Sequence, residues 1–162
     1  MTTHSHRLNS FDRTIFLGDI ENLAYNQQLG GLLPEDVQWA SAAVWSAIRH
    51  FSPQEVIASS HYFAKNIWFS WGRNPRRLVA SGPNGADHKL LEVIYNEDLH
   101  TRYDTVIIGS GDAIFAHPAA HLIAQGLNVI AIHGTGGASK KLQLAVHDTI
   151  QLPTPSTGIS AA

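Results

Sequence analysis

The stretch "IFLGDIENL" (residues 15–23) contains an apolar run that passes directly into an acid, Asp19, and then reaches Asn22. A second stretch, "VIIGSGDAIF" (residues 106–115), has the same form, and its acid is Asp112. Neither run alternates between polar and apolar residues, which is typical of strands buried on both faces of a parallel sheet. The two stretches therefore predict two buried strands, each followed by an aspartate.

Apolar runs of strand length recur along the whole chain, with segments of helical length between them. The expected strands are residues 14–17, 55–59, 77–80, 105–108 and 128–132, with a possible sixth in "DTIQL" (148–152). The expected helices lie within residues 33–51, 85–99, 113–126 and 139–146. Strands that alternate with helices predict an α/β fold, with three layers (α/β/α) and a mostly parallel sheet of five or six strands.

The composition indicates one folded domain. Of the 162 residues, 44% are hydrophobic and 15% are charged, which is enough apolar surface for a full core. We expect this domain at residues 14–152, with an N-terminal extension at 1–13 and a flexible tail at 153–162. The formal net charge of -2 limits any nucleic-acid binding to a local basic patch. The absence of cysteine excludes disulfides and thiolate zinc sites.

The chain has no apolar segment that predicts membrane association. Its first residues lack a signal-peptide core, and no stretch reaches the roughly 20 apolar residues that a membrane-spanning helix needs. We therefore expect a soluble cytoplasmic protein. A homodimer is compatible with the sequence, which specifies no dimer surface.

Three aspartates follow or flank expected strands. Asp19 and Asp112 follow two of them, and Asp87 opens the helix after the strand in "RRLVASGPNGA". Ligands of doubly wound sheets bind outside the carboxyl ends of the strands, so the three acids are expected in one crevice. Clustered carboxylates need a compensating cation, and oxygen ligands suit Mg²⁺ or Mn²⁺. Helix capping and turn formation explain each acid equally well when it is taken singly.

The order and spacing of these motifs resemble the NYN domain of the PIN-like (5′-nuclease-related) ribonuclease superfamily, over about residues 14–152. The first motif is matched by Asp19 and Asn22, the second by "GADHKLLEVI" with Asp87, and the third by "GSGDAIFA" with Asp112. The segments "AAHLIAQGLNVIAI" and "GASKKLQLAVHDTIQL" match the remainder of the domain.

The resemblance implies a metal-dependent ribonuclease with RNA as its partner. Asp19, Asp87 and Asp112 would bind Mg²⁺ or Mn²⁺, and Asn22 would hold the first acid and a phosphate or metal-bound water. Ser110 would orient Asp112 or contact phosphate, and simple turn formation is the alternative for this serine.

The sequence departs from the family pattern at Ile114, where a fourth acid is usual. Glu21 and Glu92 are the nearby acids that could substitute for it. Glu92 lies five residues after Asp87, so the two do not share a helix face. The departure leaves a second hypothesis open: a catalytically impaired domain that acts as an RNA- or protein-binding module.

Phosphate contacts would come from basic and hydroxyl side chains, since these supply most non-specific affinity for nucleic acids. The candidates are Ser139, Lys140 and Lys141 in one segment, and Arg73 in "WGRNPRRL". For each cation, a solvated surface charge is the alternative.

Two rival motifs are weaker. The segment "HGTGGASKK" lacks the ending of a phosphate-binding P-loop. A haloacid-dehalogenase-type phosphatase needs a second aspartate two residues after the first, where this chain has Glu21.

Overall fold

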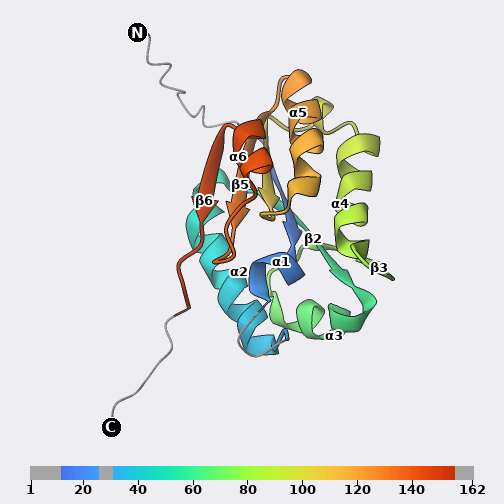
Figure 1. Cartoon of the computed structure of the whole chain (residues 1–162), viewed down its shortest axis with the longest axis vertical. Coiled ribbons are helices and arrows are strands. Elements are labelled where there is room, and N and C mark those ends of the chain that lie inside the picture. Colours follow the sequence, from blue (N-terminus) through green and yellow to red (C-terminus); the bar gives the residue numbers. More distant parts are fainter. Residues whose placement is uncertain (1–11, 26–30, 156–162) are drawn as a thin grey trace.

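The computed structural model describes residues 12–25 and 31–155 and shows a sheet of six strands in the order β3-β2-β1-β4-β5-β6 (Figure 1). Every neighbouring pair is parallel. The strands are β1 (Thr14–Asp19), β2 (Gln54–Ser60), β3 (Arg76–Ala80), β4 (Thr105–Gly109), β5 (Asn128–His133) and β6 (Asp148–Gln151). The predicted α/β fold is confirmed, including the sixth strand, and the sheet is entirely parallel.

Helices connect the strands. They are α1 (Ile20–Ala24), α2 (Pro34–Ile48), α3 (His61–Ser70), α4 (Gly85–Asn96), α5 (Ala116–Ala124) and α6 (Lys140–Ala145). Short 3-10 turns cover Arg49–Phe51, Leu99–Thr101 and Ala113–Phe115. Four of the helices lie within the predicted segments. The sequence patterns did not predict α1 and α3, which directly follow β1 and β2.

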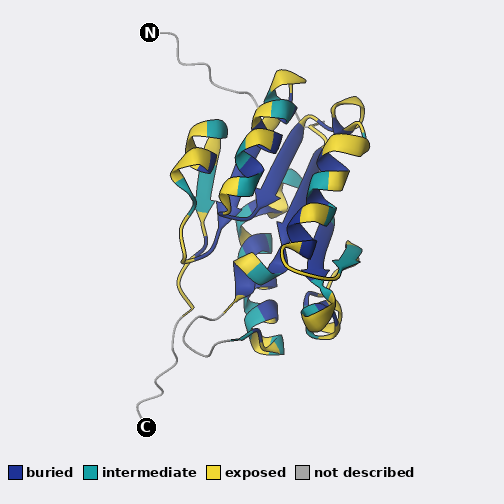
Figure 2. Ribbon diagram, turned by 45° about the vertical axis from the view of Figure 1, so that its right-hand side comes forward, coloured by how far each residue is buried: buried dark blue, intermediate teal, exposed yellow. Residues whose placement is uncertain are grey.

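The helices cover both faces of the sheet. Side chains from α4, α5 and α6 form one core with Ile15 and Leu17 of β1, while α1, α2 and α3 form the other with Phe16. Adjacent residues of one strand therefore enter opposite layers, which explains why the strand sequences are continuously apolar. Figure 2 shows the inner strands as buried elements between helices with exposed outer sides, whereas the edge strands β3 and β6 are only partly buried.

Two glycines bring β1 and β4 close together around one aromatic ring. Gly18 of β1 and Gly109 of β4 are partners in the sheet register. A Cβ atom at Gly18 would lie 2.5 Å from the Phe16 ring, and one at Gly109 would lie 2.7 Å from it. The ring occupies the space that side chains would fill, so it packs over the carboxyl ends of the two strands that lead to Asp19 and Asp112.

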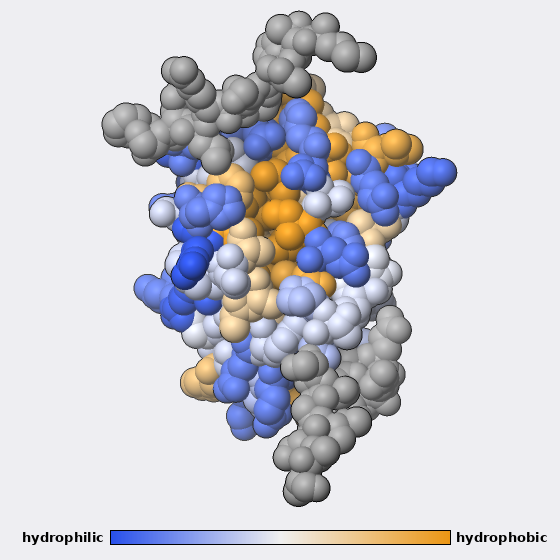
Figure 3. Space-filling model, turned by 90° about the vertical axis from the view of Figure 1, so that its left-hand side faces the viewer, coloured by the Kyte–Doolittle hydropathy of each residue, from blue (hydrophilic) through white to orange (hydrophobic). Residues whose placement is uncertain are grey.

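The outer edge of the sheet at β6 is less completely covered. Ile150 packs against the α2 side of the core but is only partly buried. Figure 3 shows a hydrophobic area, bordered by hydrophilic residues, on the face that lies at the left of Figure 1.

In the described part of the chain, no helix has the length and apolar character needed to cross a membrane. Most of the expected extension (1–13) and tail (153–162) lies outside the described residues.

Candidate functional site

The candidate site lies where the strand order reverses, between β1 and β4. The chain goes from β1 to β2 and β3 on one side, then returns to β4 beside β1 and continues to β5 and β6 on the other. β1 and β4 are therefore neighbours in the sheet, and the acids that follow them lie at the same edge. Ligands of doubly wound sheets bind at such a switch point, outside the carboxyl ends of the strands.

Asp19 and Asp87 form a buried carboxyl pair at this switch point. Asp19 is the last residue of β1, and Asp87 lies in the first turn of α4. Their carboxyl groups are within hydrogen-bonding reach of each other. Both residues are almost fully buried, with exposures of 7% and 5%. The structure thus brings together two of the predicted site residues from distant parts of the sequence.

Burial is the main reason that this pair favours protonation. Burial, followed by the hydrogen bond and the charge of Asp87, raises the pKa of Asp19 well above its usual value. Burial also raises the pKa of Asp87, and the charge of Asp112 adds to this increase. The Asp87 Oδ1 atom is buried and has no hydrogen-bond partner among residues 12–25 and 31–155. Two buried carboxylates this close need a shared proton or a cation between them.

Two further acids extend the cluster. Asp112 is exposed, and its Oδ1 atom accepts a 3.1 Å hydrogen bond from the Ile114 N–H. The negative charge of Glu21 raises the pKa of both Asp19 and Asp87. The Glu21 Oε1 atom also accepts a hydrogen bond from the N–H of Ser60, just before α3. Glu21 is therefore a fourth carboxylate whose negative charge acts on the acidic cluster.

The structure gives a physical reason for the apolar residue at position 114. The Ile114 side chain packs against the core formed by α4, α5 and α6. An acid at this position would lie against apolar side chains, which is costly without a partner. The other acid considered as a substitute, Glu92, lies on the exposed surface of α4 and pairs with Lys89 at 3.0 Å.

Asn22 connects the loop after β1 to the loop after β4. Its Oδ1 atom accepts a 3.1 Å hydrogen bond from the Gly111 N–H, while its own N–H donates to Asp19 at 3.2 Å. A Cβ atom at Gly111 would lie 2.2 Å from the Gly137 carbonyl oxygen, so only glycine permits this close approach. The loops that carry Asp19 and Asp112 are thereby held together.

The two serines of the predicted site bond to the backbone. Ser110 is fully buried, and its hydroxyl accepts a hydrogen bond from the Asp112 N–H at 3.1 Å. The Ser139 hydroxyl accepts from the Leu142 N–H at 3.1 Å, and the Ser139 N–H donates to the Gly111 carbonyl at 2.8 Å. These contacts correspond to the turn-forming alternative for Ser110, and they place the start of α6 beside Asp112.

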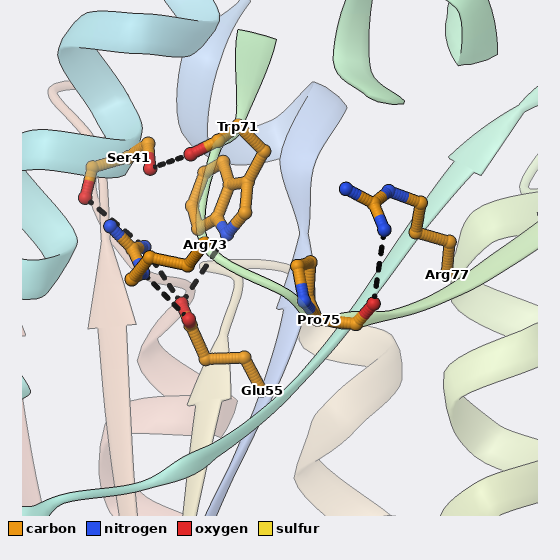
Figure 4. A network of polar contacts seen from close by, with 6 residues as sticks. All are labelled: Ser41, Glu55, Trp71, Arg73, Pro75 and Arg77. Atoms are coloured by element: carbon orange, nitrogen blue, oxygen red, sulfur yellow. Dashed lines mark hydrogen bonds and ion pairs between the residues drawn. The ribbon is translucent and has the colours of Figure 1, made fainter. Parts of the chain in front are cut away.

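The predicted basic residues lie at two different ends of the sheet. Lys140 and Lys141 are exposed at the start of α6, directly after Ser139, and form no ion pair within residues 12–25 and 31–155. Arg73 lies at the opposite end, where it pairs with Glu55 near the start of β2 (Figure 4). The structure therefore does not bring Arg73 together with the aspartates.

The surroundings of Arg73 account for its position. Its guanidinium donates to both carboxylate oxygens of Glu55, at 2.6 and 2.7 Å, and lies over the rings of Trp45 and Trp71. A bidentate pair that also stacks on two aromatic rings holds the arginine in place. These contacts favour a structural role for Arg73, away from the aspartates, and its contact with substrate stays an untested prediction.

A cavity of about 860 Å³ lies beside the acidic cluster. Glu21 and Asp112 form part of its wall, together with residues of α1, of α2 and of the loops after β4 and β5. Two aromatic residues, Tyr25 and Trp39, also line it, and the sequence patterns did not indicate them as site residues. Trp39 lies on the helix predicted within residues 33–51, where a tryptophan is usually a core residue.

The acidic cluster is not a preformed metal cage. Among residues 12–25 and 31–155, no three histidine, aspartate or glutamate side chains are arranged to hold a metal ion. The donor chemistry nevertheless fits a hard divalent cation, because carboxylate oxygens converge at one sheet edge and the buried Asp87 Oδ1 has no partner. Asp19 and Asp87 are the closest pair, and Asp112 is the third acid of the set.

Comparison with known proteins shows the fold class alone. The sequence matches no protein-family model and no curated protein. The structure is similar to the crystal structure of a Vibrio parahaemolyticus protein of unknown function, with a TM-score of 0.64 and 12% sequence identity. The match covers 88% of this chain and 93% of the other. The fold and the site together define a three-layer α/β protein with an acidic cluster at its switch point.

The bond between Asn22 and Gly111 gives a direct test of how the site is held together. Replacing Asn22 by alanine is expected to lower the free energy of unfolding by about 0.5–1.5 kcal/mol, the usual net value of one hydrogen bond. Urea denaturation of Asn22→Ala beside the wild type measures this loss. Asn96→Ala, at the exposed end of α4, is the matched control. Equal losses in both variants would show that the bond contributes nothing specific.

Proposed function

We propose that this protein is a metal-dependent ribonuclease that hydrolyses RNA phosphodiester bonds in the cytoplasm. The observation that carries the proposal is the buried Asp19–Asp87 pair at the switch point, with its raised pKa values and a carboxylate oxygen without a partner. A buried acidic pair is costly to the fold, and a bound cation would remove that cost. RNA as the substrate rests on the resemblance of the motifs to the NYN domain.

Asp19, Asp87 and Asp112 would hold one or more Mg²⁺ or Mn²⁺ ions. When bound there, such a metal would stabilise charge on the phosphate oxygens and lower the pKa of a water molecule. The protein would contribute two acids fixed by burial and a third, Asp112, on a loop held by Asn22. Glu21 would add negative charge to the site and so increase its affinity for a divalent cation.

Substrate would approach from the side on which Asp112 is exposed. Lys140 and Lys141 stand next to this loop because the Ser139 N–H donates to the Gly111 carbonyl. Their ammonium groups are available to phosphates on either side of the scissile bond, since they form no ion pair in the described part of the chain. The acidic cluster would thus bind the scissile phosphate through its metal, and the two lysines would bind a neighbouring phosphate of the same strand.

A cleavage assay tests this proposal. Purified protein is incubated with end-labelled single-stranded and hairpin RNA in Mg²⁺, in Mn²⁺ and in EDTA. We expect cleavage with either metal, none with EDTA, and a loss of about 10-fold or more in Asp112→Asn. The asparagine keeps an oxygen for the Ile114 N–H, so the loop remains capped. Glu92→Gln, which removes an exposed acid on the outside of α4, is the matched control and should cleave normally.

The second candidate function is an RNA- or protein-binding module without catalysis. It is favoured by one observation, namely that no three acidic or histidine side chains of the described residues are arranged as a metal cage. In this case the same RNA would be bound but not cut under all three conditions. That result would contradict the ribonuclease proposal.

A further inference from the structure

The cavity beside the acidic cluster has the size of a small-molecule site. Its volume of about 860 Å³ falls within the range of ligand pockets, roughly 300–1,000 Å³. It lies against the acidic cluster because Glu21 and Asp112 form part of its wall. The cavity therefore adjoins the proposed catalytic site on the side of Asp112, and neither Asp19 nor Asp87 lines it.

Two aromatic rings and a glycine-rich loop make up much of the remaining wall. Trp39 of α2 is half-buried and packs against the core of the α1, α2 and α3 layer, so its position is held. Tyr25 follows α1 and is 45% exposed. Rings of this kind bind flat heterocycles by stacking, with little dependence on which base is bound.

The glycine-rich loop after β5 offers hydrogen-bond donors to the cavity. Thr135 and Gly136 of this loop form part of the cavity wall. Among the described residues, the backbone N–H groups of these two donate to no acceptor. The loop itself is closed by a hydrogen bond from the Gly137 N–H to the Gly134 carbonyl at 3.2 Å. A Cβ atom at Gly134 would lie 3.2 Å from the Leu23 carbonyl oxygen, so the loop packs closely on α1.

The charge of the cavity decides which part of a nucleotide enters it. Glu21 and Asp112 make one side of the wall acidic, and this side repels an unshielded phosphate. An uncharged base and its ribose meet no such repulsion, and they supply both a stacking face and oxygen acceptors for the free N–H groups. The phosphate would stay outside, near the acids and their metal.

We propose that this cavity is a nucleobase-binding subsite, in which Tyr25 and Trp39 stack on an unpaired base next to the scissile phosphate. This inference rests on the proposed ribonuclease function, because it places the base of the same RNA strand. Since a base must leave its helix to enter, the subsite selects unpaired nucleotides. Recognition through stacking is tolerant of base identity.

The test measures binding without cleavage. Fluorescence anisotropy with a labelled ten-nucleotide single-stranded RNA in EDTA gives the affinity of the wild type, Tyr25→Ala, Tyr25→Phe and Trp39→Leu. We expect Tyr25→Ala and Trp39→Leu to bind about 5-fold or more weakly, and Tyr25→Phe to bind as the wild type does. Trp68→Leu, on the exposed side of α3 and outside the cavity wall, is the matched control. Thermal melting checks that each variant is folded. If Trp39→Leu does not fold, Tyr25→Ala still tests the subsite, because Tyr25 is exposed.

A second probe separates base contacts from phosphate contacts. The same ten-nucleotide strand made with abasic residues keeps every phosphate but has no base to stack. The wild type should bind it about 5-fold or more weakly than the normal strand, whereas Tyr25→Ala should distinguish the two strands much less. Equal affinity of Tyr25→Ala and the wild type for the normal strand would overturn the subsite, as would equal discrimination between the strands by both proteins.

The two proposals fail in different ways. Metal-dependent cleavage with unchanged binding by Tyr25→Ala would overturn the subsite and leave the ribonuclease function standing. Base-dependent binding that needs Tyr25, without cleavage in Mg²⁺ or Mn²⁺, would retain the subsite as the site of an RNA-binding module and overturn catalysis.

Discussion

Replacing Asp87 by asparagine is expected to reduce metal-dependent RNA cleavage by more than 100-fold and at the same time to stabilise the fold. Loss of a residue that orients a metal ligand through a hydrogen bond lowers metal affinity or activity by about 10- to 100-fold, and loss of a direct ligand should lower it further. Asp87 is the proposed ligand with a buried oxygen that has no hydrogen-bond partner in the part of the chain that the structure describes. An amide in its place cannot supply the negative charge that a divalent cation requires.

The gain in stability follows from the same burial. The pKa of Asp87 is raised mainly because burial disfavours its ionised form, and the charge of Asp112 adds to the increase, so ionisation at neutral pH opposes folding. Each pKa unit of such a shift corresponds to about 1.4 kcal/mol. A neutral asparagine removes this opposition, and we expect the free energy of unfolding at pH 8 without metal to rise by about 1 kcal/mol or more.

Single-turnover cleavage and urea denaturation of Asp87→Asn measure the two effects on one protein preparation. Glu92→Gln lies on the same helix, five residues later, and should change neither quantity by much. Unchanged cleavage in Asp87→Asn would exclude Asp87 as a metal ligand. A loss of stability instead of a gain would show that the acidic pair does not oppose folding.

A rise in pH is expected to lower the free energy of unfolding, and a bound divalent metal is expected to raise it. The folded-state pKa values of Asp19 and Asp87 are raised, so the folded protein holds a proton more tightly than the unfolded chain does. Without metal, stability is therefore highest below about pH 4, where unfolded aspartates are also protonated, considering these two groups alone. It falls as the pH rises from there through the raised pKa of the pair.

A bound cation should restore the stability lost at high pH. At a metal concentration 100 times the dissociation constant, the gain is about 2.7 kcal/mol. For a chain of this size the melting temperature would rise by roughly 5–10 °C at pH 8. At pH 5 the protons compete with the metal, and we expect a clearly smaller shift.

Differential scanning fluorimetry from pH 5 to pH 8, with EDTA, Mg²⁺ or Mn²⁺, measures both dependences. Asp87→Asn serves as the control and should show a weaker metal shift and a flatter pH profile above pH 5. If 10 mM Mg²⁺ and 10 mM Mn²⁺ both leave the wild-type melting temperature unchanged at pH 8, the acidic cluster does not bind metal in the free protein.

Most of the fold could be predicted because the signals for its strands are local. The four inner strands, β1, β2, β4 and β5, are apolar runs whose residues enter the two core layers alternately. α3 was not predicted because its exposed surface carries Tyr62 and Phe69, with exposures of 86% and 83%, which removes the usual amphipathic pattern. A contact from Glu21, distant in sequence, supports the start of this helix at Ser60.

The candidate site could be predicted in part. The positions of Asp19, Asp87 and Asp112 after or beside expected strands indicate one sheet edge, and the structure places all three near the switch point. Arg73, a candidate for phosphate contact, lies at the other end of the sheet. It precedes β3, and residues that precede parallel strands lie at the amino ends, away from the aspartates.

The α/β architecture with a mostly parallel sheet, and the acids at its strand ends, can be predicted from local sequence, because hydrophobic runs and strand termini are properties of neighbouring residues. Which of these acids are buried against each other depends on the packing of the layers. The same packing places Glu21 where its charge acts on Asp19 and Asp87, whereas Glu92 pairs with Lys89 on the surface. The packing further places Ile114 against the core and lines a cavity beside Asp112 with Tyr25 and Trp39. Burial and electrostatic coupling depend on distances between residues far apart in the chain, and these distances arise only when the layers pack.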